Sequence, residues 1–169
     1  QWGIKKITNS ISKKLDTRVS LDGFTLNPIS DLTLKNIYIG SPDSPGDTLL
    51  YAHRLSVDYH RIWDLLKKRF TISQFSIKNG TLNIHRLPDA SLTNLDLALS
   101  RLLPPRDTAK AAFVLDLRTI NASQLHVNID DEYTGTLMSL FFKRADMELD
   151  TLDITNNYVD IKDLDLDAP

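Results

Sequence analysis

The sequence predicts an all-β fold with short helices, in which a strongly twisted, bulged antiparallel sheet of stacked hairpins forms an open groove behind an N-terminal amphipathic helix. Three observations support this prediction. Apolar and polar residues alternate with a period of two after residue 17, extra polar residues interrupt the alternation, and one short pattern recurs along the chain. The 169 residues, 41% of them hydrophobic, suffice for one domain or two small ones.

The first segment is predicted to be an amphipathic helix that ends near Asp16-Thr17. Apolar residues recur at helical spacing, lysines lie on the other side, and Trp2 stands just before the apolar stripe. The stripe comprises Ile4, Ile7, Ile11 and Leu15, and the basic side comprises Lys5, Lys6, Lys13 and Lys14. Two interpretations remain open: the helix covers the edge of a sheet, or it lies at a membrane interface with its tryptophan and lysines among the headgroups.

The rest of the chain is dominated by about ten predicted strands, each with one buried and one solvated face. They cover residues 19–26, 32–39, 55–59, 72–77, 82–84, 95–99, 113–117, 125–129, 149–154 and 159–166. An extra polar residue occurs in Leu34-Lys35-Asn36-Ile37, Ile72-Ser73-Gln74-Phe75, Leu149-Asp150-Thr151-Leu152 and Ile161-Lys162-Asp163-Leu164. Each insertion predicts a β-bulge, which restores the facing of later side chains and adds twist; a turn between two short strands is the alternative.

An internal repeat relates residues 77–84, 120–127 and 154–161. Each copy is predicted to be a hairpin with a two-residue turn, at Asn79-Gly80, Ala122-Ser123 and Asn156-Asn157. Asn-Gly and Asn-Asn suit the positive φ of tight turns, whereas Ala-Ser suits it less well. The repeat favours hairpins that stack along one axis over a closed globule.

Three segments interrupt the strand pattern. A short amphipathic helix is predicted within 60–69, a loop at 42–47, and a proline-rich connection at 102–107. These breaks divide the chain into the helix at 1–17, a first β unit at 18–103 with the inserted helix, and a second β unit at 104–169.

The sequence carries no recognisable catalytic or metal-binding motif. The net charge of −2 and the lack of a basic stripe argue against nucleic-acid binding, and without cysteine no thiolate chemistry is possible. The histidines (His53, His60, His85 and His126) have no metal-ligand spacing and are interpreted as surface residues. The acidic last quarter alternates with apolar residues, as the solvated face of strands does, and a pair of distant carboxylates of glycosidase type stays open.

The continuous aliphatic face is therefore the feature that points to function. If it closes against a second sheet, the chain is a structural module that binds a protein or glycan. If the coiled sheet stays open, the face forms a trough for acyl chains, to which each buried methylene contributes about 0.8 kcal/mol.

Three ordered motifs resemble the N-terminal region of AsmA-like proteins, most closely the TamB-type translocation and assembly module proteins. They are Ala52-His53-Arg54-Leu55-Ser56-Val57, then Leu65-Leu66-Lys67-Lys68, then Asn79-Gly80-Thr81-Leu82-Asn83-Ile84. The resemblance covers roughly residues 4–87 and is moderately specific as an ordered set. It implies an inner-membrane anchor before residue 1, a periplasmic location, and a part in moving phospholipid to the outer membrane or in assembling outer-membrane proteins with a barrel partner.

The resulting hypothesis is a non-catalytic segment, without cofactor or metal, whose groove receives phospholipid acyl chains. The groove is expected to be lined by Leu32, Leu34, Ile37, Ile39, Leu55, Val57, Ile72, Phe75, Ile77, Leu82, Ile84, Leu97, Leu115, Leu117, Leu125 and Val127. The membrane-proximal helix is expected to contribute Trp2, Ile4, Lys5, Lys6, Ile7, Ile11 and Leu15.

Overall fold

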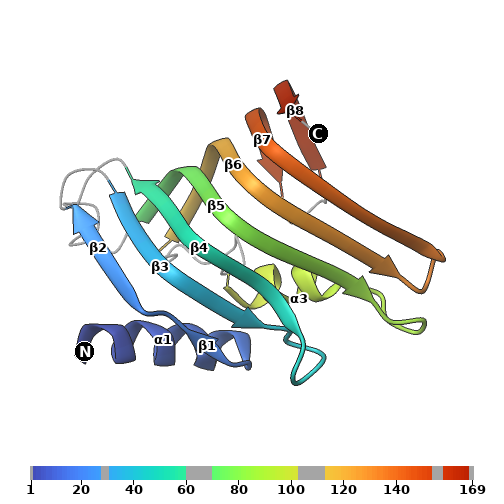
Figure 1. Cartoon of the computed structure of the whole chain (residues 1–169), viewed down its shortest axis with the longest axis horizontal. Coiled ribbons are helices and arrows are strands. Elements are labelled where there is room, and N and C mark those ends of the chain that lie inside the picture. The colour runs from blue at the N-terminus through green and yellow to red at the C-terminus, as the bar shows by residue number, and fades with distance from the viewer. Residues whose placement is uncertain (1, 28–30, 60–69, 103–112, 154–157, 168–169) are drawn as a thin grey trace.

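The computed structural model describes residues 2–27, 31–59, 70–102, 113–153 and 158–167, whose strands form one open sheet (Figure 1). The eight strands are β1 (Val19–Ser20), β2 (Gly23–Asn27), β3 (Asp31–Gly40), β4 (Thr48–Tyr59), β5 (Phe70–Arg86), β6 (Phe113–Asp131), β7 (Thr136–Asp153) and β8 (Tyr158–Asp167). Their order is β1-β3-β4-β5-β6-β7-β8, with β2 also paired to β3. The prediction of a twisted, open, all-β sheet is confirmed, and the alternative of two sheets packed face to face is wrong for the described residues.

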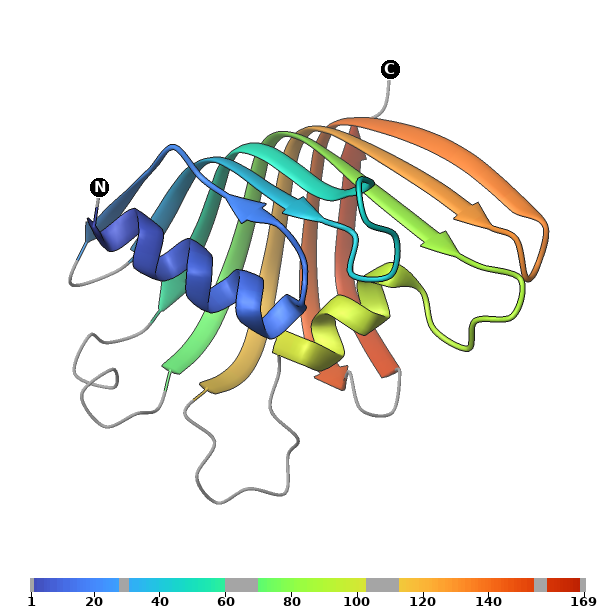
Figure 2. The same ribbon diagram turned by 90° about the horizontal axis from the view of Figure 1, so that it is seen from below.

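Two helices, α1 (Trp2–Leu15) and α3 (Asn94–Leu102), lie against the concave face of the curved sheet (Figure 2). The predicted N-terminal helix is confirmed, and it ends at Leu15, directly before Asp16, whose φ is 54°. Leu15 is fully buried, Ile4 and Ile11 pack against the core, and all four predicted lysines are exposed. Arg101 of α3 donates a hydrogen bond to the carbonyl of Leu15, so the second helix caps the C-terminus of the first.

The strands pair antiparallel except for β5 and β6, which are parallel and joined through α3. The predicted succession of antiparallel hairpins is therefore wrong at this point, because the chain makes a crossover with a helix between the two strands. At the C-terminal end of the parallel pair, Nε and Nη2 of Arg86 each donate a hydrogen bond to the carboxylate of Asp131. This bidentate pair joins the last residues of the two strands.

The strand predicted at 95–99 is wrong, because these residues belong to α3. Leucine at every second position suggested a strand, but Leu95, Leu97 and Leu99 lie on a helix whose start is fixed by a capping box. The Thr93 hydroxyl accepts a hydrogen bond from the Asp96 backbone N–H, and the Asp96 carboxylate accepts one from the Thr93 N–H. Thr-x-x-Asp before an apolar run was the signal in the sequence that would have identified the helix.

A transverse crease runs across five neighbouring strands at a single register position. Its residues are Asn36, His53, Asn79, Gln124 and Lys143, which lie opposite one another between regular ladder pairs. In each strand two successive residues point away from the helices at this line; Lys35 and Asn36, for instance, separate the buried Leu34 from the buried Ile37. Asn36, Asn79 and Gln124 adopt φ values of 48°, 50° and 51°. Irregularities of this kind bend a strand and increase its twist.

All four predicted insertions lie inside continuous strands, so the turn alternative is wrong. The predicted bulge is confirmed at three of them and is wrong at 34–37, where β3 and β4 pair residue for residue. The insertion at 34–37 lies at the crease, and the other three coincide with shifts in strand register. The predicted turn at Asn79-Gly80 is wrong, because both residues lie in β5; the positive φ of Asn79 serves the crease instead. Ala122-Ser123 likewise lies in β6, and from Gln74 onward β5 pairs with β6 at an offset of 45 residues, as in Ile77↔Ala122.

The predicted loop at 42–47 is confirmed between β3 and β4, with Gly46 at φ 102°. The predicted helix within 60–69, the prolines of the 102–107 connection and the Asn156-Asn157 turn lie outside the described residues. The boundary expected at 103/104 also falls there, and strands from both predicted β units pair in the same sheet.

Candidate functional site

The predicted groove lining lies on the concave face, but over β3–β6 much of it forms a closed core beneath the helices. Leu34, Ile37, Leu55, Ile77 and Leu125 are buried in that core, together with Leu15 of α1 and Ala98 of α3. Leu32, Ile39, Phe75, Leu82 and Val127 are partly buried against it. Val57, Ile72, Ile84 and Leu117 are half-buried strand residues, and Leu97 is a half-buried residue of α3. The side chains of Trp2, Ile7 and Leu115 lie outside the described part of the structure.

The concave face is less covered over parts of β7 and over β8, beyond the two helices, although Leu149 of β7 is only 4% exposed. Six apolar side chains of this part are 38–49% exposed, and we refer to them as the uncovered face: Met138, Leu140, Val159, Ile161, Leu164 and Leu166. Strand pairing places these side chains next to the core. Leu140 lies opposite Val127 and Leu166 lies opposite Ala145, and both partners pack against the core. The hydrophobic layer therefore continues from beneath the helices onto an open surface.

The uncovered face is long enough for one acyl chain. From Val159 to Leu166 along β8 the strand rises about 23 Å, at about 3.3 Å per residue. A phospholipid tail spans one half of a hydrocarbon core that is about 30 Å thick, or about 15 Å. Contiguous exposed apolar surface on a folded domain usually marks a place where something binds.

Sequence reasoning missed the residues of the uncovered face as candidate site residues. Residues 159–166 were recognised as a strand, but 136–148 were not, because Leu137, Met138, Leu140, Phe141 and Phe142 do not alternate with polar residues. Leu137 and Phe141 lie on the opposite face from Met138 and Leu140, as the register with β6 shows. The alternation of β8 (Val159, Ile161, Leu164 and Leu166 against four aspartates) was the available signal.

A second exposed apolar pair lies at the other edge of the sheet, beside the N-terminal end of α1. Phe24 and Leu26 are 38% and 46% exposed, and a Cβ on Gly3 would approach the Phe24 ring to 3.2 Å. Lys5 of the adjacent helix turn is exposed. Apolar side chains of β2 and a lysine of α1 are thus exposed at the same edge of the sheet.

A polar cluster at the end of β5 contains Ser41, Asp43, His85 and Asn94. The Ser41 hydroxyl donates to Asp43 at 2.7 Å, and His85 Nε2 lies 3.0 Å from the same carboxylate. Serine is thus bonded to the acid and not to the imidazole, which is not the order that activates a nucleophile. Asn94, which is fully buried, contacts Ser41 Oγ and His85 Nδ1, both at 3.1 Å. The cluster holds the 41–47 loop and α3 against β5.

The polar convex face brings Asp31 and Asp58 opposite each other across β3 and β4. Burial raises the pKa of Asp58, and repulsion from Asp31 raises it further. Thr33 donates to Asp31 at 3.3 Å. Within the described residues, no three side chains of His, Asp or Glu are arranged to hold a metal ion.

No protein-family model matches the chain, and no curated protein matches it significantly. Neither helix in the described part of the structure is long and apolar enough to cross a membrane.

Proposed function

We propose that the chain is a non-catalytic segment that holds acyl chains on the uncovered face, as part of an AsmA/TamB-like protein that moves phospholipid between the inner and outer membranes or supports outer-membrane protein assembly. The observation that carries the proposal is the row of aliphatic side chains left 38–49% exposed on a concave surface continuous with the core. The membership, the periplasmic location and the membrane partners rest on the ordered motifs near residues 52–84.

The proposal differs from the original hypothesis in where lipid binds. Residues such as Ile37 and Leu55, which are 1% and 6% exposed, serve as the packed core under α1 and α3. Acyl chains would contact β7 and β8 instead. Burial of about ten methylenes there would contribute about 8 kcal/mol before the cost of immobilising the chain.

The test compares two leucines of β7 that point to opposite faces. Leu140 belongs to the uncovered face, whereas Leu137 is 82% exposed on the convex face. The purified chain, Leu140→Glu and Leu137→Glu are each incubated with phospholipid vesicles, and bound lipid is measured by native mass spectrometry after re-isolation.

We expect lipid on the unchanged chain and on Leu137→Glu, and none on Leu140→Glu, with circular dichroism confirming that both variants fold. Equal lipid on all three proteins, or lipid on none, would refute the proposed site.

A further inference from the structure

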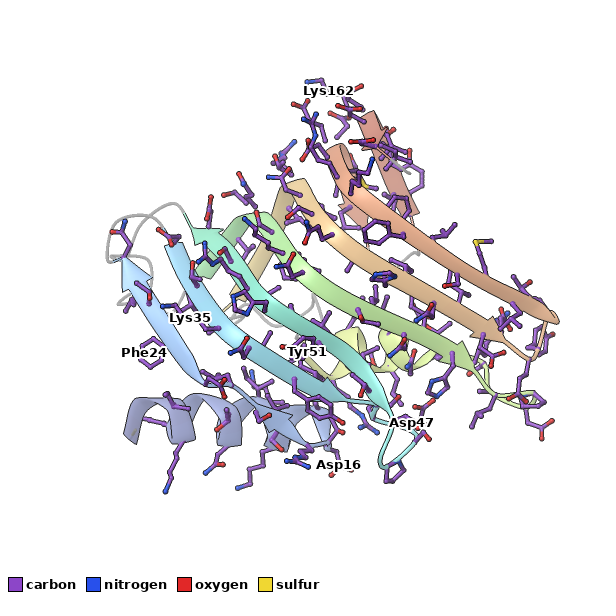
Figure 3. All side chains as sticks on the ribbon, in the orientation of Figure 1. Asp16, Phe24, Lys35, Asp47, Tyr51 and Lys162 are labelled. Atoms are coloured by element: carbon purple, nitrogen blue, oxygen red, sulfur yellow. The ribbon has the colours of Figure 1, made fainter. Side chains whose placement is uncertain are left out.

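The convex face carries a row of cations at one register position, beside the crease. Lys35 pairs with Arg54, Arg54 pairs with Lys78, and Lys78 is followed on β6 and β7 by Ser123 and Arg144. We call Lys35, Arg54, Lys78 and Arg144 the basic row; all four are exposed. Lys35 marks the position of the row on β3 in Figure 3.

This arrangement is unfavourable for the sheet alone. Like charges directly opposite each other on neighbouring strands destabilise the pairing, and here three cations stand side by side on β3, β4 and β5. In the described part of the chain, no acidic side chain lies within ion-pair distance of Lys35, Arg54 or Lys78. Asp22, just before β2, accepts a hydrogen bond from the neighbouring Asn36 at 2.8 Å.

A shallow hollow of about 320 Å³ opens beside these cations. Arg54, Lys78 and Arg144 lie along one side of it, and the neighbouring register row supplies the polar side chains of Ser56, Ser76 and Asn121. Asp146 closes the hollow at the β7 end, where its carboxylate lies 2.7 Å from Arg144 Nε. An anion would therefore sit nearer β4 and β5, between a guanidinium, an ammonium and hydroxyl donors.

We infer that the basic row and this hollow bind a phosphate group. A guanidinium offers paired N–H donors that match phosphate oxygens, a lysine adds a point charge, and serine hydroxyls complete the donor set. A bound phosphate offsets the repulsion between Arg54 and Lys78. This gives a physical reason for two cations at directly opposite positions of neighbouring strands. The site lies on the face opposite the proposed acyl-chain site and is independent of it.

The phosphate has two possible sources, a free phosphate compound or the headgroup of an anionic phospholipid at a membrane surface. The first arm of the test is an NMR titration of the intact chain with inorganic phosphate, at ionic strength held constant with chloride. The second arm is co-sedimentation with phosphatidylglycerol-containing vesicles, compared with vesicles of phosphatidylcholine alone.

Both arms compare Arg54→Gln/Lys78→Gln with Arg18→Gln/Lys162→Gln, which removes the same charge at two exposed positions away from the basic row, before β1 and on β8. We expect amide shifts around Lys35, Arg54 and Lys78, and at least about tenfold weaker binding for Arg54→Gln/Lys78→Gln. The Arg18→Gln/Lys162→Gln variant is expected to bind within twofold of the unchanged chain. Binding only to anionic vesicles, with the same dependence on Arg54 and Lys78, supports the inference and identifies the source as a headgroup.

No binding in either arm, or an equal loss in both double variants, would overturn the inference. The melting temperature gives a separate readout: removing two like charges should leave it unchanged or raise it, and a marked fall would mean that the row is structural. Leu140→Glu should leave phosphate binding intact, so that failure of this site and failure of the acyl-chain site are distinguishable.

Discussion

Replacing Asn94 by alanine should destabilise the protein more than any exposed polar substitution, because its side chain completes the hydrogen bonding of β5. The ladder between β4 and β5 ends at Leu50↔Leu82. Beyond it, Asn94 Oδ1 accepts from the His85 N–H at 2.9 Å, and Asn94 Nδ2 donates to the Asn83 carbonyl at 3.0 Å. The buried amide thus takes the place of the missing strand.

The expected loss follows from the number of bonds. Asn94 accepts one hydrogen bond, and its Nδ2 has two protons for the Asn83 carbonyl, Ser41 Oγ and His85 Nδ1. At about 1 kcal/mol net for each of three bonds, the loss is about 3 kcal/mol. A backbone group left buried without a partner adds about 1–3 kcal/mol, which brings the total to about 4–6 kcal/mol.

The assay is urea unfolding followed by circular dichroism, with Asn9→Ala as the control. Asn9 is an exposed residue of α1, and its replacement should change stability by less than about 0.5 kcal/mol. If Asn94→Ala lost less than about 1 kcal/mol, water or another donor would have to satisfy β5, and the proposed role of the amide would be refuted.

Two further substitutions test close packing and charge. Gly80→Ala should destabilise by about 1–3 kcal/mol, because its Cβ would lie 2.9 Å from the Tyr51 carbonyl oxygen, whereas Gly23→Ala, with nothing within 4 Å, should not; urea unfolding measures both. The hydrogen bonds from Arg86 lower the pKa of Asp131 to about 2, so this pair stabilises the fold above about pH 4 and the contribution is lost as pH falls toward 2. Arg86→Gln should therefore weaken the fall in unfolding midpoint over that pH range, and an unchanged pH profile would contradict the assignment.

The sequence predicted the parts of this fold that depend on local pattern. Alternation identified most strands because one face of the sheet is apolar and the other polar, and extra polar residues such as Thr151 were correctly interpreted as bulges inside strands. Helix α1 was predictable because Ile4, Ile11 and Leu15 share one stripe. These features are set by residues close together in the chain.

The features that were missed depend on contacts between distant segments. A period of two does not reveal strand direction, so the parallel pairing of β5 with β6 could not be read from it. A positive φ at Asn79 fits a hairpin turn as well as a crease, and only the neighbouring strands decide between them. The covered and uncovered parts of the concave face show the same alternation of apolar and polar residues. Which part is covered depends on where α3 packs after the chain leaves β5, and the alternation carries no information on that.

The crease links the two proposed surfaces, because it requires the same irregularity in five strands at once. It bends the sheet around the helices on one side and turns an extra row of polar side chains outward on the other. Asn79 at φ 50° should therefore tolerate glycine, whereas Asn79→Val should cost about 1–2 kcal/mol, since a β-branched residue is strained at positive φ. Lys143→Val is the matched control, because Lys143 is an exposed crease residue without a positive φ. Equal urea midpoints for the two valine variants would show that the left-handed conformation of Asn79 does not hold the crease.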